Sequence, residues 1–198
     1  MQHHLFSASA PMFDPALARI ERQVLDATAW VDYLPNWLDG ADVVFDGLIQ
    51  STEWRHQQRR MYERVVDVPR LVGTPAPNSE YGPLLTAMAD SLSARYSQSL
   101  TSISLALYRD GSDSVAPHGD KIGRRLPNPV IAIVSVGAPR RFTLKPKGGG
   151  AGHRFSLGWG DLLVMGGSCQ RTWLHGVPKV SAALPRISIM FRPDPDLH

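Results

Sequence analysis

Apolar and polar residues alternate through much of the second half of the chain, as they do in β-strands, where successive side chains point to opposite faces. Ser102 to Tyr108 alternates strictly, and the Arg109-Asp110-Gly111 that follows is typical of a turn. Val130 to Val136 is a mostly β-branched run suited to a buried strand. The pattern predicts further strands at Arg141–Leu144, His153–Leu157, Asp161–Met165, Thr172–Val177 and Arg186–Arg192. Many short strands at close spacing favour a sandwich or a barrel.

The first half of the chain shows helical periodicity instead. Apolar residues recur every three or four positions from Trp37 to Ile49, and again from Pro83 to Tyr96, where the proline suits the first turn of a helix. Asp14-Pro15 predicts the start of a further short helix. We therefore expect an α+β, mainly β fold, in which helices from the N-terminal half pack on the strands.

The last predicted strand carries charge on one of its two faces. One face holds Ile187, Ile189 and Phe191, and the other holds Arg186, Ser188, Met190 and Arg192. Two arginines on a strand that is otherwise core material need an anionic partner, because an unpaired buried charge is costly. That partner is either a carboxylate of the protein, in a structural salt bridge, or an anionic ligand.

Length and composition are those of a single soluble domain. The chain has 198 residues, of which 43% are hydrophobic and 20% charged. No stretch reaches the ~20 apolar residues that cross a bilayer, and the first residues lack the basic region and apolar run of a secretory signal. The single cysteine, Cys169, cannot form an internal disulfide, which fits a reducing compartment. We expect a monomeric, cytoplasmic protein.

The net charge of +3 is the sum of two unlike halves. Residues 1–110 hold 9 Lys and Arg against 13 Asp and Glu, a balance of −4, whereas residues 111–198 hold 12 against 5, a balance of +7. A basic half favours an anionic partner such as nucleic acid. A solvated basic surface without a partner would give the same count.

The candidate chemistry lies in the basic half, in the triplet His118-Gly119-Asp120. Ligands two residues apart on a strand point the same way, and a histidine from another strand would complete a site of two histidines and one carboxylate. Such a site holds iron(II) and leaves coordination positions open. His175 is the candidate for the third ligand, and His153 is its rival. The arginine pair Arg186 and Arg192 would place an acidic cosubstrate beside the metal.

Segments in a specific order carry a resemblance to a known family. They are Val68–Leu71, Tyr108–Asp120, Pro129–Phe142, Gly160–Met165, Trp173–His175 and Pro185–Arg192. Together they resemble the AlkB-type iron(II)/2-oxoglutarate-dependent dioxygenases, over roughly residues 20 to 193. The resemblance implies a double-stranded β-helix, a distorted jelly roll, with the metal at its open end. It implies one dioxygenase domain over 1–198, with 1–15 flexible, helices and a substrate lid at 16–100, and the catalytic jelly-roll core at 101–193.

The resemblance also implies roles for individual residues. His118, Asp120 and His175 would bind Fe(II), and Arg186 would hold the distal carboxylate of the cosubstrate 2-oxoglutarate as a bidentate pair. Tyr108 would add a hydroxyl at that end. Arg192 would orient Asp120 or the metal-bound end of the cosubstrate, which is consumed together with O2.

The family pattern is broken in three places. Ala106 stands where the family usually has asparagine, and Ser188 and Met190 stand where it usually has asparagine and threonine. The hydrogen bonds so removed are worth ~1 kcal/mol each, although Ser188 remains a candidate cosubstrate contact. Lys121 and Ile122 replace an acidic residue associated with substrate reading. We expect a working but altered oxygenase.

The implied activity is oxidative demethylation of N-alkylated bases in DNA or RNA, which releases an aldehyde, succinate and CO2. The base would have to leave its duplex or come from a single strand. Candidate substrate contacts are Tyr62 and Tyr81 as stacking platforms, Lys121, and Arg59, Arg60, Arg70, Arg124 and Arg125 as phosphate contacts. For both tyrosines a place in the core is the competing interpretation. Two other functions stay open: hydroxylation of a small molecule or protein side chain, and nucleic-acid binding without catalysis.

Overall fold

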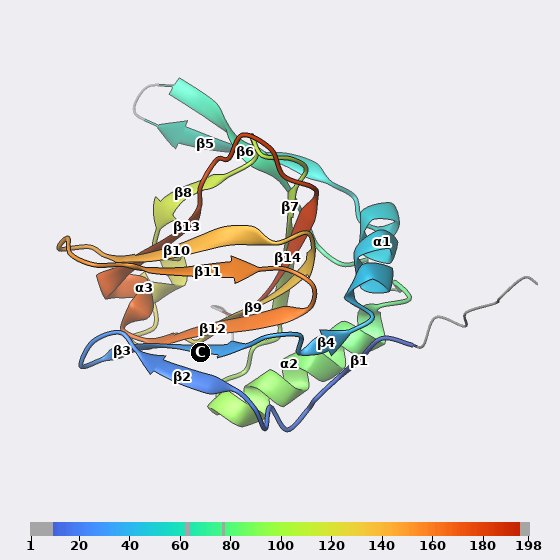
Figure 1. Cartoon of the computed structure of the whole chain (residues 1–198), viewed down its shortest axis with the longest axis horizontal. Helices are drawn as coiled ribbons and strands as arrows, with labels where there is room; N and C mark the ends of the chain where they lie inside the picture. The colour runs from blue at the N-terminus through green and yellow to red at the C-terminus, as the bar shows by residue number, and fades with distance from the viewer. Residues whose placement is uncertain (1–9, 62–63, 77, 195–198) are drawn as a thin grey trace, which may run out of the picture.

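Two antiparallel sheets lie face to face in the computed structural model, which describes residues 10–61, 64–76 and 78–194, with the side chains of 57–67 left out (Figure 1). The large sheet consists, in spatial order, of β2 (Glu21–Val24), β3 (Ala29–Leu34), β12 (Asp161–Gly167), β9 (Ile131–Gly137), β14 (Arg186–Arg192), β7 (Ser102–Tyr108), β6 (Arg64–Gly73) and β5 (Arg55–Met61). The small sheet consists of β11 (His153–Leu157), β10 (Arg140–Pro146), β13 (Trp173–Val177) and β8 (Val115–His118). A short pair, β1 (Met12–Phe13) with β4 (Leu38–Asp39), stands apart from both.

Each face of the large sheet is covered by a different layer. Helices α1 (Ala41–Ser51) and α2 (Gly82–Tyr96) pack on one face, where Leu48 and Leu92 join a hydrophobic cluster with Ile187. The small sheet covers the other face, where Phe142 packs in a second cluster with Met190. None of the helices in the described ranges is long and apolar enough to cross a membrane.

Strand β14 lies at the centre of the large sheet, between β7 and β9. Its predicted alternation is confirmed, because Ile187, Ile189 and Phe191 all face the helices. The opposite face, which carries both arginines, is directed at the small sheet. The pattern of the strand therefore placed its charged residues between the two sheets.

The predicted strands of the second half are all present, with ends that differ by at most a few residues. At Thr172 the chain is still in the short helix α3 (Cys169–Thr172), so β13 begins one residue later than expected. The helix expected from Trp37 begins at Ala41, because Leu38 pairs with Phe13 in β4 and β1.

The expected helix after Asp14 is wrong. Its carboxylate accepts hydrogen bonds from the backbone N–H groups of Ala16 and Ala18, which form a turn rather than a helix. The N-terminal half also supplies strands β2, β3, β5 and β6 as well as two helices. Of the residues expected to be flexible, 1–9 lie outside the described ranges, and Met12–Phe13 forms β1.

Candidate active site

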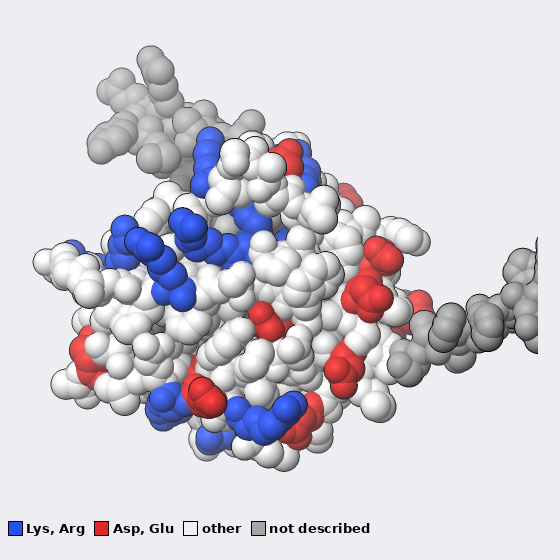
Figure 2. Space-filling model, viewed as in Figure 1, with Lys and Arg blue, Asp and Glu red and all other residues white. Residues whose placement is uncertain are grey.

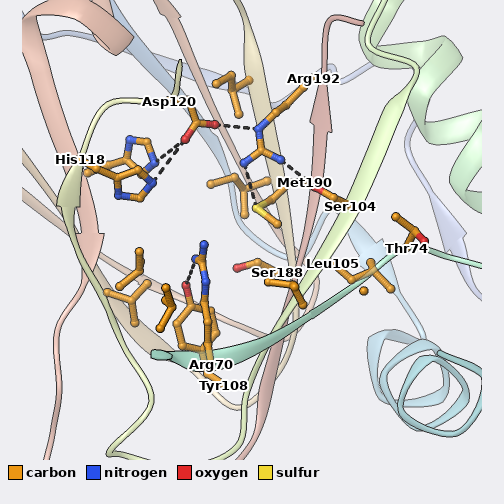
Figure 3. Close-up of a pocket in the computed structure, with 18 of the residues that line it drawn as sticks. Arg70, Thr74, Ser104, Leu105, Tyr108, His118, Asp120, Ser188, Met190 and Arg192 are labelled. Carbon is orange, nitrogen blue, oxygen red and sulfur yellow. Dashed lines mark hydrogen bonds and ion pairs between the residues drawn. The ribbon is translucent and has the colours of Figure 1, made fainter. Parts of the chain in front are cut away.

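His118, Asp120 and His175 meet at one end of the space between the sheets (Figure 3). β8 ends at His118, and this residue pairs directly with His175 on β13, so the two rings lie 4.4 Å apart between centroids. Asp120 Oδ1 is 3.4 Å from His118 Nε2 and 3.6 Å from His175 Nε2. One ligand atom from each residue thus lies within 4.8 Å of the others, a spacing suited to a single metal ion.

Neighbouring groups fix the orientation of two of these side chains. The Nδ1 atom of His118 lies 2.9 Å from the Ala116 carbonyl oxygen, and because a carbonyl can only accept, Nδ1 carries a hydrogen and Nε2 is the ring atom directed at Asp120. Arg192 Nε donates to Asp120 Oδ2 at 2.7 Å, which leaves Oδ1 directed at the two histidines. The Asp120 N–H donates to the Gln170 side chain, as the chain turns out of β8.

A glycine is required between the first two ligands. A Cβ added at Gly119 would overlap the backbone carbonyl oxygen of Gln170, so only glycine permits this approach. Through it, the turn that carries Asp120 lies against α3, directly before the strand that carries His175.

The electrostatic environment holds two of the three side chains, Asp120 and His175, in the forms that bind metal. Burial alone would raise the pKa of Asp120, but Arg192, His118 and His175 outweigh it and hold this pKa well below its usual range. Burial lowers the pKa of His175 to about 3, against an opposing effect of Asp120. Near neutral pH the site therefore offers a carboxylate and a neutral imidazole, and metal binding need not displace a proton from either.

His153, the rival third ligand, is not part of this cluster. It lies on β11, where its Nδ1 is 3.0 Å from the Gln23 side-chain nitrogen and its ring is 5.6 Å from that of Trp173. The structure therefore brings together the expected His118, Asp120 and His175.

A cavity of about 970 Å³ extends from these three residues between the sheets. At its far end lies Tyr108, whose ring has three guanidinium groups within about 6 Å: Arg186 at 5.5 Å, Arg140 at 5.7 Å and Arg70 at 6.0 Å. Arg140 donates to the backbone carbonyls of three residues, Asp110, Asp113 and Pro178, and so serves as a structural group. Arg186 and Arg70 have fewer hydrogen-bond partners.

Arg186 is fully buried and only partly hydrogen-bonded. Its Nη2 donates to Ser135 Oγ at 2.6 Å, but its Nε and Nη1 have no partner among the described residues. Burial lowers the pKa of Arg186 to about 10, so the group remains charged at neutral pH. It lies just behind the residues that line the cavity, next to Tyr108. The structural salt bridge considered as an alternative for Arg186 is not found among the described residues, and the two unpartnered nitrogens suit an anionic ligand.

Arg70 lines the cavity from β6. Its Nη1 donates to the Tyr108 hydroxyl oxygen at 3.1 Å, and its Nε is buried without a hydrogen-bond partner. Because the hydroxyl oxygen acts as acceptor here, its own hydrogen stays available for an anion. Arg70, expected as a phosphate contact, therefore lies inside the cavity beside Tyr108 (Figure 3).

Comparisons with known proteins agree with this geometry. The chain is 30% identical over 186 residues to alpha-ketoglutarate-dependent dioxygenase alkB homolog 3 of Bos taurus, which covers 80% of this chain and 64% of that protein. It is 37% identical over 115 residues to the DNA oxidative demethylase ALKBH2 of Arabidopsis thaliana, over 46% of this chain and 37% of the relative. Residues 48–192 match the 2OG-Fe(II) oxygenase superfamily. The chain is an AlkB-type member of this superfamily. It spans just under two thirds of the length of the alkB homolog 3 relatives.

Solved structures show the same fold at low sequence identity. OsALKBH1 aligns with a TM-score of 0.56 at 14% identity, over 88% of this chain and 100% of that chain. A prolyl hydroxylase from Trichoplax adhaerens aligns with a TM-score of 0.61 at 12% identity, over 83% of each chain. The expected double-stranded β-helix with helices packed on it is confirmed.

Among the residues that depart from the family pattern, Ser188 and Met190 line the cavity from β14, whereas Lys121 and Ile122 line it from the turn after β8. Ser188 pairs with Ala106 across β14 and β7, and it lines the cavity where the family's amide side chains would be. Met190 accepts a hydrogen bond at its sulfur from Arg192 Nη2, at 3.2 Å. Lys121 is exposed at the rim of the cavity. The wall formed by β14 and β7 therefore has fewer hydrogen-bonding groups than the family pattern provides.

Tyr81 lies apart from the cavity. Its ring is buried between α1 and α2, and its hydroxyl donates to the Val43 carbonyl oxygen at 3.1 Å. It is therefore not available to stack on a base, and the core interpretation is the correct one. Tyr62 falls outside the described residues, as do the side chains of Arg59 and Arg60.

Several residues of the site were not anticipated. Ser104 accepts a hydrogen bond from Arg192 Nη1 at 2.8 Å, and the alternation of β7 could have revealed it, because it shares a strand face with Tyr108. Ser135 lies in a predicted strand and Arg140 directly before another, but nothing in their spacing indicates the contacts that they make. Gln170 reaches Asp120 from 50 positions away, and no local signal marks it.

Proposed function

We propose that this protein is an iron(II)- and 2-oxoglutarate-dependent demethylase of N-alkylated bases in nucleic acid. The observation that carries the proposal is the combination of two features along one cavity: a His-Asp-His cluster at one end, and a buried arginine with unpartnered nitrogens just behind Tyr108 at the other. Two imidazole nitrogens and one carboxylate oxygen fit iron(II). A buried guanidinium with two unpartnered nitrogens fits a carboxylate, which accepts two parallel hydrogen bonds.

His118, Asp120 and His175 would hold the iron, and Arg186, with the hydroxyl of Tyr108, would hold the distal carboxylate of 2-oxoglutarate. When bound, iron and 2-oxoglutarate with O2 supply the oxidation of an N-alkyl C–H bond to C–OH, while the oxo acid becomes succinate and CO2. The C–N bond then breaks, the base regains its hydrogen, and the carbon leaves as an aldehyde.

The remaining residues act by positioning and by excluding water. Arg192 occupies Oδ2 of Asp120, so that a single oxygen of this carboxylate faces the metal position. It is itself held by Ser104 and by the sulfur of Met190. Phe142 packs against the ring of His175, with centroids 5.7 Å apart, and shields that side of the site from solvent. The hydrogen bonds of Arg192 would thereby help to orient Asp120, in place of the amide and hydroxyl side chains that the family usually has at positions 106, 188 and 190.

The choice of nucleic acid as substrate rests on charge and on the relatives. The relative in Arabidopsis thaliana is named a DNA oxidative demethylase. Residues 121–193 contain twelve Lys and Arg but a single acidic residue, Asp161. Lys121 and Arg124 stand exposed at the rim of the cavity, where a phosphate next to the target base would lie.

The test is an assay of short DNA and RNA strands that carry single N-methylated bases, with iron(II), 2-oxoglutarate and O2. We expect equal amounts of formaldehyde and succinate, and no product from His118→Ala. Succinate without formaldehyde across all the methylated bases would instead favour hydroxylation of another substrate. Strand binding with no succinate at all would favour a binding protein without catalysis.

A further inference from the structure

A second hollow, of about 730 Å³, lies on the other side of the segment that carries two of the metal ligands. His118, Gly119 and Asp120 line both this hollow and the cavity of the candidate active site, and so does Arg124. The second hollow is therefore separated from the first by little more than this segment. Arg124 is exposed and lies where the two cavities meet.

The lining of the second hollow is strongly basic. Besides Arg124, it includes Arg125, Lys147 and Arg171, which come from the turn after η1 (Lys121–Arg124), the β10–β11 hairpin and α3. Its one carboxylate is that of Asp120, which Arg192 already holds in an ion pair at 2.7 Å. A space of this size, with the cations of Arg124, Lys147 and Arg171 and no free carboxylate, is suited to an anion.

The basic character continues onto the outer face of the small sheet. The strands β8, β10, β11 and β13 contain no acidic residue. The exposed Arg141 and Lys145 alternate on β10 with the buried Phe142 and Leu144, and Arg154 is exposed on β11 beside them. Lys and Arg side chains gather over β10 and β11 in Figure 2, whereas Asp and Glu side chains lie mostly toward α1.

Five of these basic side chains have no acidic partner among the described residues. Within the described part of the chain, Arg124, Lys147 and Arg141 form no ion pair, and neither do Lys145 and Arg154. The Arg171 side chain donates to the neutral amide oxygen of Asn128 at 3.4 Å. Like charges gathered without counter-charges repel one another, so this surface is stabilised when an anion binds to it.

We propose that this surface binds the sugar–phosphate backbone of the strand that carries the target base. The proposed binding surface consists of the second hollow together with Arg141, Lys145 and Arg154 on the outer face of the small sheet. The strand would leave the active site at Arg124, cross the second hollow and continue over β10 and β11. The inference rests on the proposed function for its substrate class. Each bound phosphate adds affinity, with no dependence on sequence and with strong dependence on salt.

The test reverses two charges of the surface and compares this with the same change elsewhere. The variant Lys147→Glu/Arg171→Glu alters the second hollow, and Arg19→Glu/Arg95→Glu makes an equal change in net charge at exposed positions outside it, before β2 and on α2. Lys147 and Arg171 are both exposed, and thermal unfolding checks that both variants fold as the natural protein does.

Binding of an unmodified, dye-labelled single strand of about 20 nucleotides is measured by fluorescence anisotropy at several salt concentrations. For Lys147→Glu/Arg171→Glu we expect affinity at low salt to fall by about tenfold or more. The slope of log affinity against log salt should become shallower by about 1.4, the value for two phosphate contacts to a single strand. For Arg19→Glu/Arg95→Glu we expect less than about a threefold change. Equal losses in the two variants would overturn the inference, because net charge alone would then explain them.

Turnover gives a second readout that depends on strand length. The ratio of kcat/KM for a methylated strand of about 20 nucleotides to that for a methylated trinucleotide should fall about tenfold in Lys147→Glu/Arg171→Glu. An unchanged ratio contradicts a backbone contact beyond the target base. If the natural protein binds the strand through this surface but releases no formaldehyde, the proposed function fails while the binding surface stands.

Discussion

Arg186 shows how a single side chain can indicate a ligand. It is fully buried, carries a charge, and leaves two of its nitrogens without partners among the described residues. A buried donor without a partner costs about 1–3 kcal/mol, and more when it is charged. A protein that only needed to fill this position could use an apolar residue at lower cost. The position therefore makes physical sense when a carboxylate completes the hydrogen bonds of Arg186.

Replacing Arg186 by lysine tests this directly. Lysine keeps the charge but loses the planar pair of donors, so at least one charge-assisted hydrogen bond, worth about 1.5–3 kcal/mol, disappears. We expect the affinity for 2-oxoglutarate to fall about 10- to 100-fold, measured by calorimetry with Mn(II) in place of iron and without O2. An affinity equal to that of the natural protein would show that Arg186 does not hold the cosubstrate. Arg95→Lys, on the exposed side of α2, is the matched control and should leave the affinity unchanged.

Among the elements, the pairing of β8 with β13 forms the metal centre, and the turn after β7 leads the chain into β8. In that turn, Asp113 is buried and accepts hydrogen bonds from the Arg109 backbone N–H and from its guanidinium, at 2.8 to 2.9 Å. Arg140 donates to the Asp113 carbonyl from the neighbouring strand β10. The turn is thereby attached to both sheets, which fixes where β8 begins.

The Asp113→Asn variant should lose stability in a pH-dependent way. Burial alone would raise the pKa of Asp113, but the hydrogen bonds from Arg109 outweigh it and lower this pKa below its ordinary value of 3.8. A lowered pKa stabilises the folded state above pH ~4, and this contribution is lost as the pH falls through the folded-state value. We expect a deficit of about 1–3 kcal/mol at pH 7 in urea unfolding, shrinking toward pH 3. A deficit that does not change with pH would contradict this account.

Helix α1 packs closely enough on Tyr81 to require glycine at one position. A Cβ at Gly47 would overlap the ring of Tyr81, which its hydrogen bond to Val43 and its burial hold in place. Alanine favours a helix by about 1 kcal/mol over glycine, but overpacking costs about 1–3 kcal/mol. Because the overlap is severe, we take the upper part of the overpacking range and subtract the helix gain, and we expect Gly47→Ala to lower the unfolding free energy by about 1–2 kcal/mol. Gly148→Ala, where nothing lies within 4 Å, should stay within about 0.5 kcal/mol of the natural protein.

At the scale of the whole molecule, the metal centre joins parts of the chain that are far apart. His118 and Asp120 precede the long segment through β9 to β12, and His175 follows it. The cavity that extends from these ligands is a gap in the packing of the two sheets, lined with both polar and apolar side chains. Ligands that fill this gap bind the folded state alone, so they should stabilise the whole domain.

We expect Mn(II) with 2-oxoglutarate to raise the midpoint of thermal unfolding. At a ligand concentration of about 100 times Kd the gain is about 2.7 kcal/mol, or about 5–11 °C for a domain of this size. A chelator should reverse the shift, and His175→Ala should show little of it. A shift of the same size in His175→Ala would mean that the metal binds elsewhere.

Apart from β8, the amino-acid sequence by itself determined the strands of the second half, and it also determined the two main helices, the metal-ligand candidates and the inward face of β14. These depend on periodicity and spacing, which act over a few residues. The strands of the first half were missed because their patterns are not regular: all four residues of β2 are exposed, and β5 is almost entirely polar. Such strands form because a neighbouring strand supplies hydrogen bonds, and this depends on the whole fold.

Only the tertiary structure decided which distant side chains meet. It placed His175 rather than His153 beside Asp120, turned Arg70 inward to Tyr108, and buried Tyr81 under α1. It also left the nitrogens of Arg186 without partners. These outcomes depend on register and packing between elements many residues apart, for which one linear sequence holds no local signal.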